Sequence, residues 1–110
     1  MKEHLNITVN GKVKEIDFLY YSHLSAHKNN ITGFVQNGSD TSIYIEAEGT
    51  SEELKIFIEY FNNGPLSNHF DDMQVDKGDL KNFMYFKRTK DREQEKKKHD
   101  FFRKFFSKKK

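Results

Sequence analysis

His23 and His27 are spaced four residues apart, so on a helix they would share a face and could ligate one metal ion. No carboxylate or third histidine is placed by the sequence to complete such a site, so we expect no metal centre and interpret the two as rim or exposed histidines. The chain has no cysteine, which excludes disulfides, thiolate catalysis and cysteine-ligated metals. No serine–histidine–acid arrangement can be assembled from the sequence, and no organic cofactor is indicated.

The last part of the chain combines basic and aromatic residues. Its four phenylalanines, Phe101, Phe102, Phe105 and Phe106, form one stripe with Lys and Arg around it if the segment is helical. Such a segment can lie on an anionic membrane surface, dock into a groove of a protein partner or fold back on its own acidic body. Basic residues with aromatics also permit nucleic-acid contact, and the alternative without any ligand is a solvated tail.

Charge divides the chain into two parts. Residues 1–86 carry 7 Lys and Arg against 13 Asp and Glu, whereas residues 87–110 carry 12 against 4. This asymmetry predicts a domain over residues 1–87 and a basic, phenylalanine-rich tail over residues 88–110. The acidity of the domain makes nucleic acid an unfavourable partner for it, because nucleic-acid affinity depends on neutralising phosphates.

The length of 110 residues suits one domain, which we expect to be a monomer. Nothing near the start resembles the apolar core of a signal peptide. No stretch is long and apolar enough to cross a bilayer. We therefore expect a cytoplasmic protein.

The first half of the chain predicts three strands and a helix. Apolar and polar residues alternate over residues 4–10 and 41–48, which is the period of half-buried strands, and residues 32–37 are interpreted as a short strand between them. Phe18–Lys28 contains neither Gly nor Pro and has apolar residues at helical spacing, so it predicts a helix. Because so few polar residues join the second and third strands, they should form an antiparallel hairpin.

The second helix has the clearest signals. Thr50 lies three residues before Glu53, which is the spacing of a capping box. A single apolar stripe follows, made of Leu54, Phe57, Ile58 and Phe61. Gly64 and Pro65 end the helix. The remaining strand candidates are residues 70–76 and 83–87.

This order of elements predicts an α+β fold, the ferredoxin-like βαββαβ sandwich. Both helices should cover one face of an antiparallel sheet, and the polar residues of the strands should leave the other face solvated. A basic tail, helical in one interpretation, follows the domain. Because this fold hosts many activities, it does not name a function by itself.

Two segments resemble the acylphosphatase family. Val9–Leu19 is similar to its first signature, which usually reads aliphatic, any, Gly, any, Val, Gln, Gly, Val, any, Phe, Arg. Gly33–Asn37, followed by Ile43 and Gly49, is similar to its second signature of Gly, aromatic, Val, variable and Asn, then Gly, Val and a later Gly. The resemblance runs to about Phe86 and agrees with the predicted order of elements.

The resemblance implies roles for single residues. In acylphosphatases the loop before the first helix binds the substrate phosphate through backbone N–H groups, an arginine at the helix start grips the same phosphate, and an asparagine positions the attacking water. The asparagine role falls on Asn37, unless Asn37 and Gly38 only shape the hairpin turn. The arginine position falls on Leu19. The phosphate-binding loop falls on Lys14, Glu15, Ile16, Asp17 and Phe18.

The first signature departs from the family pattern at this loop. Leu19 has neither charge nor donor, and Lys14, Glu15 and Ile16 stand where the family has Gln, Gly and Val. Asp17 adds a second carboxylate. At 4 Å, two like charges repel by roughly 4 kcal/mol at a surface-type dielectric, and loss of one transition-state donor costs about 10²–10³ in rate.

We therefore predict an acylphosphatase-like protein that is catalytically impaired or inactive and acts as a binding or regulatory module. The alternative is an acylphosphatase that hydrolyses the carboxyl–phosphate bond of acyl phosphates with Asn37, Lys14 and the loop amides. An acyl phosphate or another small anion is the expected ligand of the domain, and an anionic membrane surface or a protein that of the tail. Neither interpretation requires a cofactor.

Overall fold

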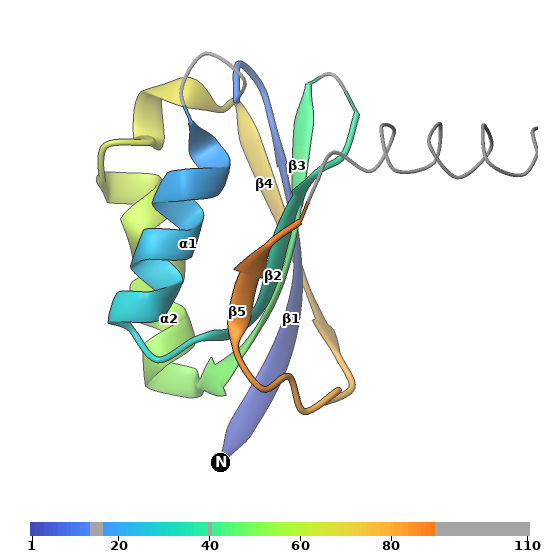
Figure 1. Ribbon diagram of the computed structural model, residues 1–110. Coiled ribbons are helices and arrows are strands. Elements are labelled where there is room, and N and C mark those ends of the chain that lie inside the picture. Colours follow the sequence, from blue (N-terminus) through green and yellow to red (C-terminus); the bar gives the residue numbers. More distant parts are fainter. Residues whose placement is uncertain (14–16, 40, 90–110) are drawn as a thin grey trace, which may run out of the picture.

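The computed structural model describes residues 1–13, 17–39 and 41–89. The elements follow the predicted order, including the short strand expected at the end (Figure 1). They are β1 (Lys2–Asn10), α1 (Phe18–Lys28), β2 (Thr32–Asn37), β3 (Ser42–Thr50), α2 (Ser51–Asn63), the 3₁₀ helix η1 (Ser67–His69), β4 (Asp72–Gly78) and β5 (Phe86–Arg88). Residues 90–110 of the predicted tail, with its four phenylalanines, lie outside the described residues.

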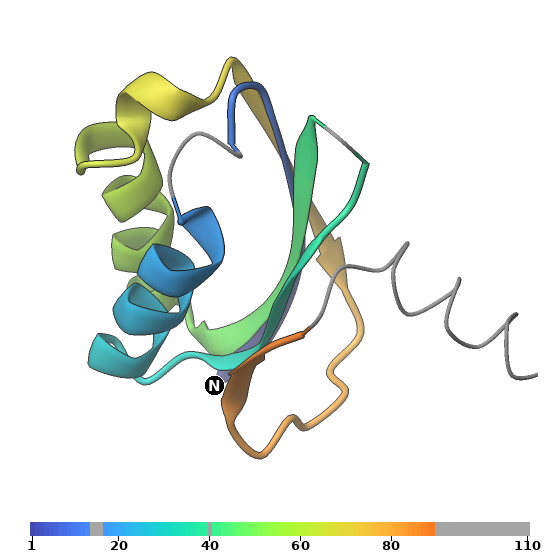
Figure 2. The ribbon, with the colours of Figure 1, turned by 45° about the horizontal axis from the view of Figure 1, so that its top comes forward.

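The five strands form one sheet in the order β4-β1-β3-β2-β5. β1 pairs antiparallel with β3 and β4, and β2 pairs antiparallel with β3. The last strand, β5, differs because it runs parallel to β2 at one edge. Figures 1 and 2 show both helices on the same face of the sheet. The α+β ferredoxin-like sandwich is therefore confirmed, while the strands predicted at 70–76 and 83–87 begin two to three residues later, as β4 and β5.

The core lies between the sheet and the helices, where alternate residues of each strand point inward. In the central strand β3 these are Ile43, Ile45 and Ala47, all at most 1% exposed. They share one cluster with Phe57 and Phe61 of α2, whose rings pack edge to face with centroids 5.0 Å apart. Each large side chain buried in this way contributes roughly 1.5–3 kcal/mol, so the sheet and α2 stabilise each other.

The predicted capping box begins α2. The Thr50 hydroxyl accepts the Glu53 N–H at 3.2 Å, and the Glu53 carboxylate accepts the Thr50 N–H at 2.9 Å. The hydrogen bond from the Thr50 backbone holds the pKa of Glu53 below its usual range, although desolvation opposes it. The β3–α2 junction is therefore fixed by two reciprocal bonds.

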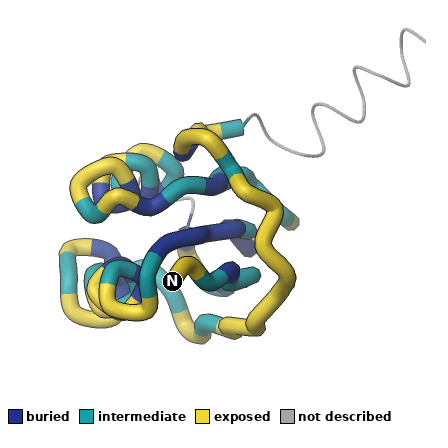
Figure 3. The backbone as a smooth tube through the Cα atoms, turned by 90° about the horizontal axis from the view of Figure 1, so that it is seen from below, coloured by how far each residue is buried: buried dark blue, intermediate teal, exposed yellow. Residues whose placement is uncertain are grey.

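The sheet face opposite the helices corrects the prediction of a solvated face. Glu46 and Glu48 point to this face as expected, yet they are only 6% and 1% exposed. Residues 79–85, here called the strap, cover them on the way from β4 to β5. Because β4 and β5 lie at opposite edges of the sheet, the chain between them must cross β1, β3 and β2. Figure 3 shows this exposed stretch on the side away from the helices.

Candidate functional site

The N-terminus of α1 is where the resemblance places the phosphate-binding loop. Residues 14–16 of that loop lie outside the described residues, so its geometry is known from Asp17 and Phe18. Phe18 is 1% exposed and stacks on Phe61 of α2 with ring centroids 5.5 Å apart. The first residue of α1 thus anchors the helix to the core instead of facing a ligand.

Asp17 is the N-cap of α1. Its Oδ1 accepts the Tyr20 N–H at 3.0 Å, and its backbone carbonyl accepts the Tyr21 N–H at 3.2 Å. This carboxylate occupies an amide that an anion at the helix terminus would otherwise bind, and it places a negative charge at the positive end of the helix dipole. A phosphate bound here would compete with a carboxylate of the chain itself.

Leu19 is the second residue of α1. It is half-buried and packs against the core cluster, whereas its neighbour Tyr20 is 44% exposed. An aliphatic side chain donates no hydrogen bond and carries no charge. At the position where the resemblance places a phosphate-binding arginine, the chain therefore supplies apolar packing.

An arginine that the sequence analysis assigned to the tail lies at this same end of α1. Arg88 ends β5 and pairs with Val35 of β2. Its Nη1 is 4.0 Å from Asp17 Oδ2, and its Cζ is 5.7 Å from the centroid of the Tyr20 ring. Local sequence could not reveal this neighbourhood, because it depends on the parallel pairing of β5 with β2 across more than 50 residues of chain.

Asn37 is the last residue of β2, and its side chain is half-buried. A two-residue Asn-Gly hairpin turn needs positive φ at both residues. Among the described residues, positive φ occurs at Gly11, Asn30, Gly33 and Asn82. The turn is closed instead by the Gly38 N–H, which donates to the Ser42 carbonyl at 3.0 Å, and by the Ser39 N–H, which donates to Ser42 Oγ at 2.8 Å. This geometry does not support the interpretation that Asn37 only shapes the turn.

The end of β1, the start of α1 and the β2–β3 hairpin lie at one end of the sheet (Figure 1). Gly11 connects two of them, because its N–H donates to the Thr41 carbonyl at 2.8 Å. Gly11 has a φ of +140°, and a Cβ there would lie 2.6 Å from Phe70 Cα, so this close crossing requires glycine. Asn37 and the N-terminus of α1 are thus on the same end of the domain.

Of the two histidines of α1, His23 is half-buried and His27 is exposed. Their rings stack with centroids 6.5 Å apart, and His23 also lies 6.1 Å from the ring of Phe86. Among the described residues, no group of three or more His, Asp or Glu is arranged to hold a metal ion. Within the same part of the chain, no helix is long and apolar enough to span a membrane.

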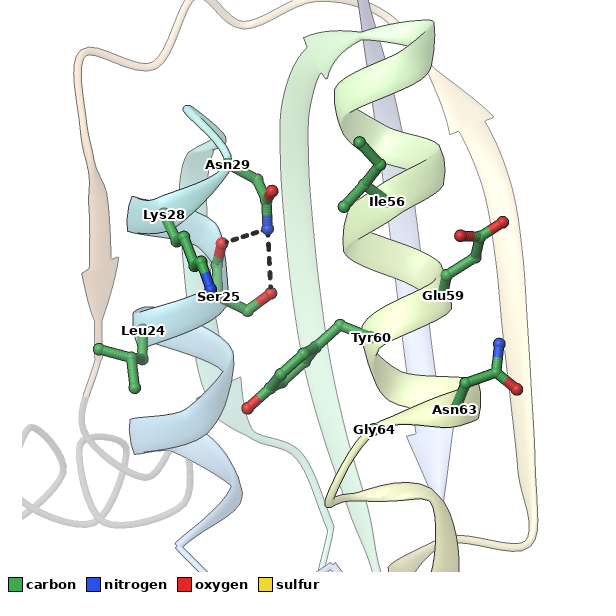
Figure 4. A pocket seen from close by; sticks show the side chains of 9 residues that line it. All are labelled: Leu24, Ser25, Lys28, Asn29, Ile56, Glu59, Tyr60, Asn63 and Gly64. Atoms are coloured by element: carbon green, nitrogen blue, oxygen red, sulfur yellow. Dashed lines mark hydrogen bonds between the residues drawn. The ribbon is translucent and has the colours of Figure 1, made fainter.

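A groove of about 510 Å³ lies between α1 and α2 (Figure 4). It is lined by Leu24, Ser25, Lys28, Asn29, Ile56, Glu59, Tyr60, Asn63 and Gly64. Burial and the neighbouring Tyr21 raise the pKa of Tyr60, so its phenol stays protonated. None of the lining residues is one that the resemblance places in the phosphate site.

Comparisons with known proteins agree with the resemblance. The family model "Acylphosphatase" matches residues 5–90. An acylphosphatase of Bacillus licheniformis is 34% identical over 70 residues, which are 64% of this chain and 78% of that protein. The crystal structure of acylphosphatase from Bacillus subtilis superposes with a TM-score of 0.73 at 30% identity, covering 81% of this chain and 99% of that one. Full-length HypF in the phosphate- and nucleotide-bound form gives a TM-score of 0.77 at 28% identity, with 84% of this chain matching 12% of that one.

Proposed function

Because the chain belongs to the acylphosphatase family, we propose that it keeps the family scaffold, hydrolyses acyl phosphates poorly, and acts as a binding or regulatory module. The observation that carries this proposal is the composition of the N-terminus of α1. Leu19 packs against the core where the family motif has arginine, and the Asp17 carboxylate accepts the Tyr20 N–H. The proposed site therefore lacks a guanidinium at the motif position and already holds an anion.

Charge determines how strongly this arrangement disfavours phosphate. A phosphoryl oxygen 4 Å from the Asp17 carboxylate would be repelled by roughly 4 kcal/mol at an effective dielectric near 20, before screening by salt. Arg88 reduces this repulsion, since its guanidinium is 4.0 Å from the same carboxylate. Both side chains are largely exposed, so salt weakens the repulsion and the compensation together. The bidentate grip that an arginine gives to a phosphate is still missing at position 19.

Weak hydrolysis of acyl phosphates is the second candidate function, and two observations favour it. Asn37 and Gly38 lack the positive φ values of a two-residue Asn-Gly turn, which favours a role for the Asn37 amide in orienting a water molecule. Arg88 brings a guanidinium to the end of α1 where the resemblance places the phosphate. In this candidate, water attacks the phosphoryl group, the bond between phosphorus and the acyl oxygen breaks, and a carboxylate leaves.

Hydrolysis of benzoyl phosphate separates the two candidates. We expect a rate for the parent protein close to the uncatalysed rate, and the same low rate for Asn37→Ala. Leu19→Arg is expected to raise the rate by about 10²-fold if the missing guanidinium is the main defect. Leu24→Arg is the matched control, because it adds an arginine to an exposed position one to two turns further along α1. Turnover in the parent that disappears in Asn37→Ala would overturn the proposal.

For the tail we propose binding to an anionic membrane surface, supported by its 11 Lys and Arg and its four phenylalanines. The test is co-sedimentation with vesicles that contain phosphatidylserine, comparing the full chain with a chain that ends at Thr89. Binding by the full chain alone, reduced by salt, supports the proposal. Equal binding by both chains, or binding by neither, contradicts it.

A further inference from the structure

A group of buried polar side chains lies under the strap, on the sheet face away from the helices. We call it the His4 cluster, and its members are His4, Asn6, Tyr44, Glu46, Glu48 and Lys81. His4 is 2% exposed and lies directly opposite Glu48 in the pairing of β1 with β3. Neither the family motifs nor the proposed function uses this cluster.

Both nitrogens of the His4 ring face acceptor oxygens. Nδ1 is 2.7 Å from Glu48 Oε2, and Nε2 is 3.2 Å from Glu46 Oε1 and 2.9 Å from Asn6 Oδ1. A neutral imidazole donates from one nitrogen, whereas the imidazolium donates from both. The arrangement therefore fits a charged ring held between two carboxylates. Lys81 Nζ lies 2.7 Å from Glu46 Oε1, so with an imidazolium at His4 the cluster would hold two positive and two negative charges.

The strap is attached to the sheet through this cluster. Glu48 accepts the backbone N–H groups of Lys81 at 2.6 Å and Phe83 at 3.1 Å. The ring of Phe83 stacks on His4 with centroids 6.0 Å apart, and it packs edge to face on Phe34 at 5.8 Å. The same carboxylate thus binds His4 on one side and the strap backbone on the other.

The surrounding elements offer the ring no other close ionic partner among the described residues. From β4, Gly78 pairs with His4, and a Cβ there would lie 2.9 Å from His4 Cδ2, so the contact is tight. Asp76 of β4 is opposite Asn6 and Lys87 of β5 is opposite Phe34, on the same face of the sheet, and both are exposed. Tyr44 donates from its hydroxyl to Glu46 Oε2 at 2.9 Å.

We propose that the strap is a pH-sensitive element of this protein, held on the sheet while His4 is an imidazolium and loosened when His4 loses its proton. Loss of the proton leaves the cluster with one net negative charge and turns a ring lone pair toward a carboxylate or amide oxygen. Buried like charges and unpaired acceptors are costly, so the Glu48 carboxylate and the strap amides separate more often. The strap is therefore bound to the sheet at lower pH and released as the pH rises.

Release of the strap affects the edge of the sheet that carries Arg88. The strap runs directly into β5, whose start is fixed by the Gly33 N–H donating to the Tyr85 carbonyl at 3.0 Å. β5 then places Arg88 beside Asp17 at the N-terminus of α1. The strap and β5 thus connect the protonation of His4 to the position of the Arg88 guanidinium.

Amide hydrogen exchange of the full chain, followed by NMR, tests the proposal. The reporters are the Lys81 and Phe83 N–H groups, and the Ile45 N–H in the central strand reports global opening. The ¹⁵N spectrum reports at each pH whether one or both ring nitrogens of His4 carry a proton. As His4 loses a proton, the protection of the two strap amides, corrected for intrinsic exchange, should fall by about tenfold relative to Ile45.

Three variants make the result decisive. His4→Gln keeps a polar side chain without the charge and should show low strap protection at every pH. Lys81→Gln removes the exposed Nζ but keeps the backbone bond to Glu48, and it should lower strap protection without unfolding the domain. His27→Gln is the control, because His27 is exposed on α1. Strap protection that does not change when His4 gains its second proton, strap protection in His4→Gln equal to that of the parent, or an equal loss at Ile45 would overturn the proposal.

Discussion

Replacing Glu48 by glutamine tests whether the sheet face away from the helices is held by charge. Glu48 is 1% exposed and has three donors: the Lys81 N–H at 2.6 Å, the Phe83 N–H at 3.1 Å and His4 Nδ1 at 2.7 Å. Glutamine has nearly the same volume but keeps only one acceptor oxygen. Its NH₂ group must therefore face one of these donors, and His4 loses its charged partner.

The size of the effect follows from these contacts. Removing one partner of a buried ion pair costs about 3–5 kcal/mol. Glutamine keeps one acceptor, so we place the loss at the lower end, about 3 kcal/mol. This is a large share of the roughly 5–15 kcal/mol of a typical domain. With an m-value of about 1.5–2 kcal/mol/M in urea, the unfolding midpoint should fall by about 1.5–2 M.

The pH dependence has a definite sign. Desolvation acts to raise the pKa of Glu48, but hydrogen bonds from the Lys81 backbone, His4 and the Phe83 backbone, together with the charge of His4, hold that pKa below its usual range. A carboxyl whose pKa is lowered by folding stabilises the fold above its unfolded pKa and loses that contribution as the pH falls through its folded pKa. The difference between parent and Glu48→Gln should therefore shrink as the pH falls through the folded pKa of Glu48.

Urea unfolding at about pH 7 and about pH 4 measures both quantities. Glu59→Gln is the control, because Glu59 is exposed on α2 and its loss should leave the midpoint nearly unchanged. Equal midpoints for Glu48→Gln and Glu59→Gln at neutral pH would refute the reasoning. So would a difference between parent and Glu48→Gln that grows as the pH falls.

Two further substitutions test the start of α2 and the pairing of β2 with β3. Thr50→Ala removes the hydroxyl that accepts the Glu53 N–H. It should lower the free energy of unfolding, measured by chemical denaturation, by about 1 kcal/mol. An unchanged free energy of unfolding would show that the capping box adds no stability. Gly33→Ala should destabilise by about 3 kcal/mol or more, because Gly33 has a φ of +136° and its Cβ would lie only 1.9 Å from the Glu46 carbonyl oxygen. Thermal unfolding measures this loss. A melting temperature equal to that of the parent would contradict the close approach of the Gly33 backbone to β3.

Elements with strong local signals could be predicted from the sequence. The bounds of α1 and β2 agree with the prediction, and the capping box of Thr50 and Glu53 is present. Alternation in β3 identified correctly which residues face the core. These features depend on neighbours within a few residues, so the local sequence contains the information.

Features that depend on distant pairing could not be predicted. The polar alternation of Glu46 and Glu48 indicates a face, but it does not show that a later segment covers that face. Cross-strand partners such as His4 and Glu48 are 44 residues apart. Arg88 reaches Asp17 only because β5 pairs with β2 in parallel. In each case the position follows from sheet topology, which the local pattern does not specify.

Titration of inorganic phosphate, followed by the amide signals of Tyr20 and Tyr21, tests the central claim about the N-terminus of α1 most directly. The parent should show no saturable shift up to about 10 mM phosphate, because Asp17 occupies the helix terminus and Leu19 offers no donor. The double variant Asp17→Ser and Leu19→Arg, which keeps an N-cap residue, should bind in the low millimolar range or tighter. Saturable binding by the parent well below 1 mM, with shifts at these two amides, would contradict the account.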